Sequence, residues 1–174
     1  MITFRELQFG DLDFLVEVRN ECRAKLHDNT EFTLAQARAW FETAHPRFYL
    51  ILNGDIPIGY FRTSQWSDRH RHVCIGCDLH ASHRGKGFAT AAYPRFLRFL
   101  FEEHGMNKVS LEVLSPNRRA ARLYQRLGFV VEGVKRQEIW RDGGYLDSVL
   151  MSMLKSEFFS LYGDGRQGPD SGPS

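Results

Sequence analysis

The sequence has few cysteines, little net charge and no long apolar run. Three cysteines among 174 residues are too few for a disulfide framework, so we expect a reducing, cytoplasmic setting. A formal net charge of +2 gives no electrostatic reason to expect nucleic-acid or membrane binding. No apolar stretch approaches the length that crosses a bilayer, and the N-terminus lacks the segments of a signal peptide. The expected partner is therefore neither a nucleic acid nor a membrane.

The overall composition is typical of one globular domain. Hydrophobic residues make up 43% of the chain and charged residues 25%. The length suits a single domain, which we place over residues 1–155. Residues 156–174 are expected to form a C-terminal extension, which is rich in Gly and Pro from residue 163. We expect a monomer or a homodimer.

The hydrophobic periodicity predicts strands and helices in a mixed order. Runs of strands beside a β-α-β-α stretch predict an α/β fold with a mixed sheet and helices on both faces. The expected elements are a strand at 2–7, helices capped by Asp11 and Thr33, a hairpin over 48–63, strands at 73–79 and 108–114, helices over 86–104 and 117–127, and a closing hairpin over 130–154.

The most informative stretch is the loop Leu79–Ala89, which follows a strand and precedes a long helix. Gly85 and Gly87 let the backbone turn sharply and approach a ligand. The N–H groups of a helix's first turn have no internal partner, and the helix dipole with Arg84 and Lys86 favours negative charge there. The loop is either a phosphate site or a plain helix start.

A second motif decides between these interpretations. Arg84-x-x-Gly87-x-Ala89 is followed by Asn117, Ala120, Leu123-Tyr124 and Gly128-Phe129. Together they resemble the GNAT superfamily of acetyl-CoA-dependent N-acetyltransferases, in a branch that holds ribosomal-protein alanine, polyamine and nucleotide-amino-sugar acetyltransferases. The resemblance implies the acyl-CoA N-acyltransferase fold, a centrally splayed sheet of about seven strands, and acetyl-CoA as the donor substrate.

The resemblance also implies which residues bind acetyl-CoA. The loop would hold the pyrophosphate, the backbone before it would pair with the pantetheine arm, and Asn117 would hold that arm from the next helix. The expected cofactor-binding residues are Cys77, Asp78, Leu79, Arg84, Gly85, Lys86, Gly87, Phe88, Ala89, Thr90, Asn117, Ala120 and Tyr124. No metal is expected, because Cys74 and Cys77 point to opposite faces of a strand and suit core positions better than a zinc site.

Acetyl transfer to an amine needs a base for the ammonium and an acid for the departing thiolate. Tyr124, with an ordinary pKa near ~10, is the expected acid; the alternative is a ring that only packs. Glu112 is the expected base because it lies twelve residues before Tyr124, as in the resembling family. The alternatives are a solvent-facing glutamate with a water chain as base, or another base among Asp78, Asp28, Glu31 and His80.

The acceptor is expected at the other end of the fold, over residues 19–40 and 136–145. Asp28 and Glu31 suit a cationic amine, and Trp66 and Trp140 suit stacking on a ring. We expect the primary amine of a small molecule, such as an amino sugar or polyamine; the alternatives are a protein N-terminus, a non-catalytic CoA-binding regulatory module, or an interaction domain that docks through the helix over 86–104. The arginine face formed by Arg118, Arg119, Arg122 and Arg126 is either solvated or meets the nucleotide's phosphate.

Overall fold

The computed structural model describes residues 1–163, in which seven strands form one sheet in the order β1-β2-β3-β4-β5-β7-β6. The strands are β1 (Ile2–Glu6), β2 (Tyr49–Asn53), β3 (Ile56–Ser67), β4 (His72–Leu79), β5 (Lys108–Leu114), β6 (Val130–Arg141) and β7 (Gly144–Leu154). The α-helices are α1 (Leu12–Cys22), α2 (Leu34–Ala44), α3 (Phe88–Glu102), α4 (Arg118–Leu127) and α5 (Lys155–Tyr162). The predicted mixed α/β sheet of seven strands with helices on both faces is confirmed.

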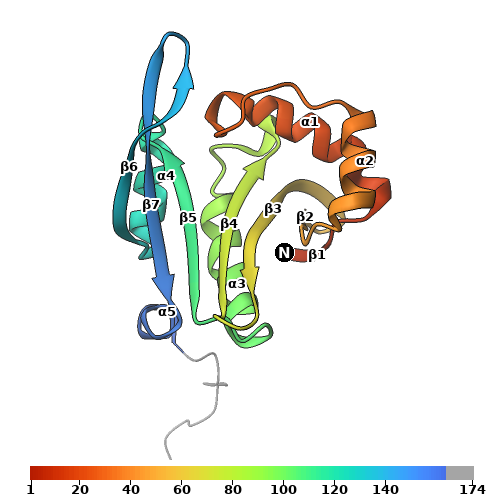
Figure 1. The fold of residues 1–174 in the computed structure, drawn as a ribbon. Coiled ribbons are helices and arrows are strands. Elements are labelled where there is room, and N and C mark those ends of the chain that lie inside the picture. The colour runs from red at the N-terminus through yellow and green to blue at the C-terminus, as the bar shows by residue number, and fades with distance from the viewer. Residues whose placement is uncertain (164–174) are drawn as a thin grey trace, which may run out of the picture.

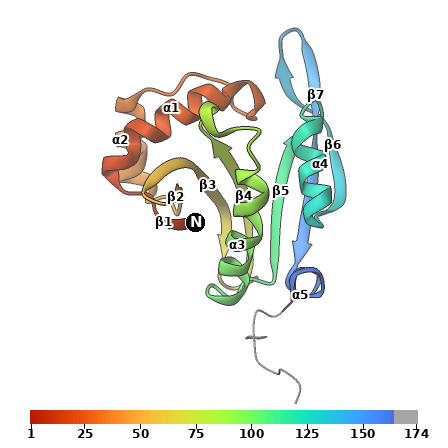
Figure 2. The same cartoon turned by 180° about the vertical axis from the view of Figure 1, so that it is seen from behind.

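The helices form two layers, one on each face of the sheet. Helices α1 and α2 cover one face, where they bury Leu15 and Ala37 against Leu50 and Tyr60 of the sheet (Figure 1). Helices α3 and α4 cover the other face, as the reverse view shows (Figure 2). Because side chains alternate along a strand, β4 directs Val73 and Ile75 to the α3 layer.

The sheet is split in the middle. Strands β4 and β5 are parallel neighbours, but they pair only over His72–Cys74 and Lys108–Ser110. Beyond these residues the two strands diverge towards the end that carries α1 (Figure 1). All other neighbouring strands pair antiparallel. Diverging strands leave backbone N–H and C=O groups without ladder partners, and such groups need another partner.

Local signals account for most element boundaries. Thr33 caps α2 in a capping box with Gln36, and Gly128 ends α4 in the left-handed region at φ 97°, both as expected. Asp11 behaves differently from its prediction: it makes no cap bond to α1. Its carboxylate accepts the N–H of Gln8 and pairs with Arg5 at 2.6 Å, so it fixes the turn before the helix instead.

Helix α5 was not expected from the sequence. Its Phe158 is fully buried and its ring centroid lies 5.3 Å from that of Phe101 on α3. The segment after residue 155 therefore completes the core as far as Tyr162. Apart from Gly163, the predicted Gly- and Pro-rich tail lies outside the described residues. No helix among residues 1–163 is long and apolar enough to cross a membrane.

Candidate active site

A cleft of about 380 Å³ opens where β4 and β5 diverge. It begins at the loop before α3, follows the end of β4 past the start of α4, and reaches the connection that follows α1. The cleft therefore joins the predicted cofactor loop to the predicted acceptor end of the fold. Tyr124 and Glu112 line this same cleft.

The loop before α3 presents a row of unpaired donors. Within residues 1–163, no backbone N–H from Gly85 to Thr90 donates a hydrogen bond. Gly85 and Gly87 adopt φ of 78° and 82°, a region that other residues rarely enter, and this shape directs successive N–H groups outward. Unpaired N–H groups at a helix N-terminus are the chemistry that binds a pyrophosphate, so the loop fits the phosphate end of acetyl-CoA.

The side chain of Arg84 is occupied within the protein. Its Nε donates to the carbonyl of Leu79 at 2.8 Å, and its Nη2 lies 3.2 Å from Glu21 on α1. The guanidinium that faces the loop belongs instead to Arg119 of α4, whose Nη2 would lie 3.3 Å from a Cβ added at Gly85. The structure thus offers a cation to the loop from α4, and contact of this arginine face with a phosphate stays a prediction.

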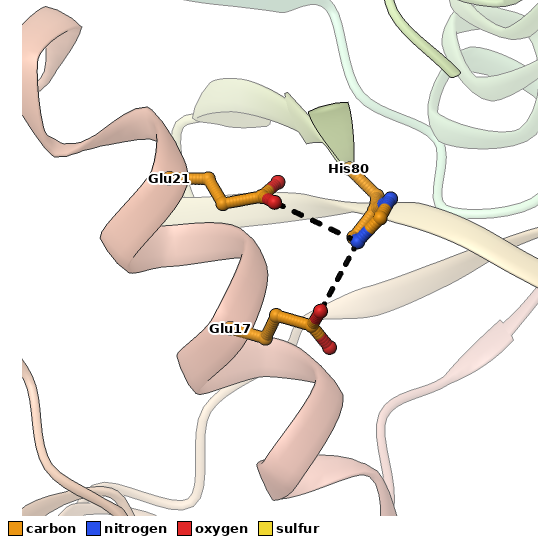
Figure 3. Close-up of side chains that lie close together, drawn as sticks. All are labelled: Glu17, Glu21 and His80. Atoms are coloured by element: carbon orange, nitrogen blue, oxygen red, sulfur yellow. Dashed lines mark hydrogen bonds and ion pairs between the residues drawn. The ribbon is translucent and has the colours of Figure 1, made fainter. Parts of the chain in front are cut away.

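Glu21 ties the start of the loop to α1. Its Oε2 accepts the N–H of Ala81 at 2.7 Å. The adjacent His80 lies with Nε2 3.2 Å from Glu17 and 3.7 Å from Glu21, as Figure 3 shows. His80, an alternative base from the sequence, does not line the cleft among the described residues. The cluster holds α1 against the loop.

The backbone of β4 alternates between its two neighbours. His80 donates its N–H to Ile58 of the β3 side, at 3.0 Å. By the alternation of an antiparallel ladder, Asp78 then faces β3 as well, whereas Cys77 and Leu79 face the gap towards β5. The expectation that the Asp78 backbone binds the pantetheine arm therefore does not fit. The N–H groups of Cys77 and Leu79 do fit.

Asn117 and Tyr124 reach the cleft from α4. Asn117 caps the helix by accepting the N–H of Ala120 at 3.3 Å, and this leaves its amide N–H₂ for a ligand. The Tyr124 hydroxyl accepts a hydrogen bond from Tyr93 at 3.3 Å. Burial raises the pKa of Tyr124 to about 12, although the hydrogen bond from Tyr93 acts in the opposite direction. Tyr124 therefore holds its proton at neutral pH.

Glu112 lies on β5 with both carboxylate oxygens near a partner. Oε1 is 2.6 Å from the Nζ of Lys135, and Oε2 is 3.7 Å from Nε2 of His27. His27 also lies 2.8 Å from the Ser148 hydroxyl. Burial is the largest influence on His27 and lowers its pKa, so its imidazole is neutral at neutral pH.

Sequence reasoning missed His27 and Arg62, which also line the cleft. Arg62 lies on β3 with Nε 2.8 Å from the buried carboxylate of Asp78. A histidine in a polar loop carries no pattern signal. Arg62, by contrast, could have been found from the sequence. A single arginine in an apolar strand is a signal, because a charge in such a strand needs a partner nearby.

Other predicted residues lie away from the cleft. Asp28 pairs with Arg19 at 2.9 Å and Glu31 with Arg23 at 3.6 Å; both carboxylates are exposed, and neither belongs to the described lining of the cleft. Trp66 and Trp140 do not line the cleft within residues 1–163.

The two cysteines in the cleft are protonated. Burial raises the pKa of Cys22 to about 11 and that of Cys77 well above its ordinary value. A thiol nucleophile acts as the thiolate, so neither side chain suits a covalent intermediate.

Comparison with known proteins identifies the family of this chain. Residues 2–130 match the acetyltransferase (GNAT) domain family. The spermidine N(1)-acetyltransferase of Vibrio cholerae is 26% identical over 166 residues, covering 91% of this chain and 96% of that protein. A crystal structure of spermidine N-acetyltransferase from Vibrio cholerae in complex with CoA and spermine superimposes with a TM-score of 0.86 at 25% identity, over 91% of this chain and 98% of that one.

A shorter match has higher identity. An uncharacterised N-acetyltransferase from the SPbeta prophage of Bacillus subtilis is 41% identical over 76 residues, which span 44% of this chain and 43% of that protein. The family match covers most of the chain, and the split sheet and the N–H loop supply the structure that acetyl-CoA transfer needs. The chain therefore belongs to the GNAT acetyltransferase family and is an acetyl-CoA-dependent acyltransferase.

Proposed function

We propose that this chain transfers the acetyl group of acetyl-CoA directly to the primary amine of a small molecule, such as an amino sugar, a polyamine or a similar compound. The observation that carries the proposal is the single cleft that joins the loop at Gly85 to Tyr124 and Glu112. The small-molecule acceptor is supported by relatives named spermidine acetyltransferases.

Donor binding uses backbone groups first. The N–H groups from Gly85 to Thr90 donate hydrogen bonds to the pyrophosphate oxygens at the N-terminus of α3. Arg119 adds a positive charge beside them. The N–H groups of Cys77 and Leu79 pair with the extended pantetheine arm, and the amide of Asn117 holds it from α4. In this proposal the thioester lies where β4 and β5 diverge.

The proposed chemistry has no covalent enzyme intermediate and needs no metal. Glu112, directly or through a water, takes the proton from the acceptor's ammonium. The freed amine nitrogen attacks the thioester carbonyl carbon, and N–H groups near Leu79 stabilise the resulting oxyanion. The carbon–sulfur bond then breaks, and Tyr124 gives its proton to the thiolate. The second proton on nitrogen leaves to solvent.

An acceptor screen tests the function. The purified chain is mixed with acetyl-CoA and amino sugars, polyamines or peptides with free N-termini, and both thiol release and product mass are measured. Thiol release with a matching acetylated product supports the proposal. Acetyl-CoA binding without turnover on any acceptor indicates a non-catalytic CoA-binding module. An absence of binding favours an interaction domain, and acetylation of peptides alone favours a protein acceptor.

Tyr124→Phe tests the mechanism. We expect kcat to fall by about 10²- to 10⁴-fold, the usual contribution of a general acid, with unchanged affinity for CoA by calorimetry. Tyr49→Phe, at a buried position outside the described lining of the cleft, is the matched control and keeps full activity. Unchanged turnover in Tyr124→Phe would remove this residue from the mechanism.

We also propose that the chain acts as a monomer or homodimer in the cytoplasm. Its cysteines Cys22, Cys74 and Cys77 are all free thiols, which suits a reducing compartment.

A further inference from the structure

Arg62 holds a fixed position on the acceptor side of the cleft. Its guanidinium lies against Gly76, its partner across β3 and β4, where an added Cβ would come within 2.5 Å of Nη2 and 2.8 Å of Cζ. Its Nε lies 2.8 Å from Oδ2 of Asp78, whose side chain is only 5% exposed. Glycine at position 76 and the buried carboxylate therefore hold the guanidinium flat on the sheet.

The outer edge of this guanidinium is open. Within residues 1–163 neither Nη atom of Arg62 makes a hydrogen bond, although the side chain is 39% exposed into the cleft that it lines. Arg62 lines the same cleft as Tyr124 and His27. An arginine with one edge held and one edge free presents two parallel N–H donors to a ligand.

The remaining charges of the cleft do not suit a polycation. Among the described residues, the acidic side chains that line it are Asp78 and Glu112. Asp78 is paired with Arg62. Glu112 lies 2.6 Å from Lys135, which also lies 3.3 Å from Glu138. Lys25, on the connection after α1, adds a further positive charge to the lining. A second ammonium of a polyamine placed near Arg62 would therefore meet that cation and a carboxylate, Asp78, that is already paired with it.

We propose that Arg62 binds an anionic group of the acceptor, so that the acceptor is a primary amine bearing a carboxylate or phosphate rather than a polyamine. This inference rests on the proposed function and narrows its substrate class. An oxyanion would receive the two free Nη donors of Arg62, a charge-assisted pairing that is stronger than one between neutral groups. A cationic arm at the same place would be repelled.

The test uses matched pairs of acceptors with the full chain and acetyl-CoA. The first set compares each of several amino acids with its carboxamide. The second compares phosphoethanolamine with ethanolamine. Spermidine serves as the polycationic acceptor. We expect kcat/KM to favour the anionic member by roughly 10- to 100-fold, as for a hydrogen bond to a charged group, with spermidine slower still. Because the amine of a carboxamide is less basic and so less protonated, its intrinsic reactivity would favour the opposite order.

The Arg62→Gln variant removes the proposed contact. We expect the preference for anionic acceptors to collapse to within a few-fold, while KM for acetyl-CoA is unchanged and Arg62→Lys keeps part of the preference. Arg69→Gln, in the exposed turn between β3 and β4, is the matched control. Since Arg62→Gln leaves Asp78 buried without its cation, the double variant Arg62→Gln/Asp78→Asn provides a folded alternative.

Three outcomes would overturn this inference. Wild-type preference for carboxamides or spermidine would exclude an anionic acceptor, although acetyl transfer itself would stand. An equal loss on every acceptor in Arg62→Gln would place Arg62 at the reacting groups instead. Failure of all acceptors, neutral and cationic included, would overturn the proposed function together with this inference.

Discussion

The hydroxyl of Tyr93 on α3 donates a hydrogen bond to the hydroxyl of Tyr124 on α4, at 3.3 Å. The two rings meet edge to face with centroids 5.6 Å apart. This bond opposes the effect of burial, which raises the pKa of Tyr124. Tyr93 therefore tunes the group that we propose as the acid.

Replacement of Tyr93 by Phe removes this donor. We expect kcat to fall by roughly 2- to 10-fold, the value of one neutral hydrogen bond, because Tyr124 becomes a weaker acid. Tyr49→Phe, a buried tyrosine packed on the same helix α3, is the control and keeps its rate. If Tyr93 acts only through Tyr124, the double variant Tyr93→Phe/Tyr124→Phe is no slower than Tyr124→Phe; additive losses would contradict this.

Replacement of Glu112 by Gln tests the base. We expect kcat/KM to fall by about 10²- to 10⁴-fold, since the amide cannot take a proton. Glu132→Gln is a matched control, because Glu132 is also a strand glutamate, paired with Lys108 at 2.5 Å, and it does not line the cleft. Similar rates for both variants would show that the proton leaves through water or another group.

Replacement of Arg119 by Ala tests the phosphate end. We expect KM for acetyl-CoA to rise by roughly 10- to 100-fold with kcat unchanged, because a charge-assisted hydrogen bond to phosphate is lost. High salt should reduce the difference in KM for acetyl-CoA between Arg119→Ala and wild type, because salt screens the charge. Arg118→Ala alters an exposed neighbour that does not line the cleft, and it should leave KM unchanged. Equal effects of the two variants would indicate only general charge attraction.

Replacement of Gly59 by Ala tests the packing of β3 against the end of β4. An added Cβ would lie 2.3 Å from the Asp78 carbonyl oxygen and 2.9 Å from Leu79 Cα, and neither backbone atom can move freely. We expect a loss of about 1–3 kcal/mol in the free energy of unfolding, seen as a lower thermal midpoint. In the control Gly133→Ala the added Cβ has no neighbour within 4 Å, so its thermal midpoint should lie near that of wild type. A wild-type midpoint for Gly59→Ala would refute this packing.

The stability of the fold should depend on pH through His27. Because burial lowers its pKa below 6.5, the unfolded chain binds its proton at a higher pH than the folded chain does. The free energy of unfolding therefore decreases as pH falls below about 6.5, until the folded histidine also protonates.

Urea unfolding of wild type and His27→Gln from pH 5 to 7.5 measures this contribution. We expect the wild type to lose stability relative to His27→Gln as the pH falls, while the exposed control His70→Gln follows wild type. If the difference in unfolding free energy between wild type and His27→Gln is the same at every pH, His27 titrates alike in the folded and unfolded states.

Much of the fold could be predicted because its signals are local. The alternation of Val73 and Ile75, the cap at Thr33 and the glycine at 128 each specify an element through neighbours in the chain, and the structure confirms these elements. Helix α5 escaped prediction because a short helix after a strand has little periodicity of its own. What stabilises it is the packing of Phe158 on α3.

The sequence by itself determined the loop that we propose binds acetyl-CoA, since Gly85, Gly87 and the helix that follows are contiguous. Only the tertiary structure decided which charged groups meet on the proposed acceptor side. It pairs Arg62 with Asp78 across β3 and β4, and it brings His27 to 3.7 Å from Glu112 over 85 residues of sequence (112 − 27). The physical reason is that charge compensation acts through space, and burying these groups requires partners that only the assembled sheet and helices supply.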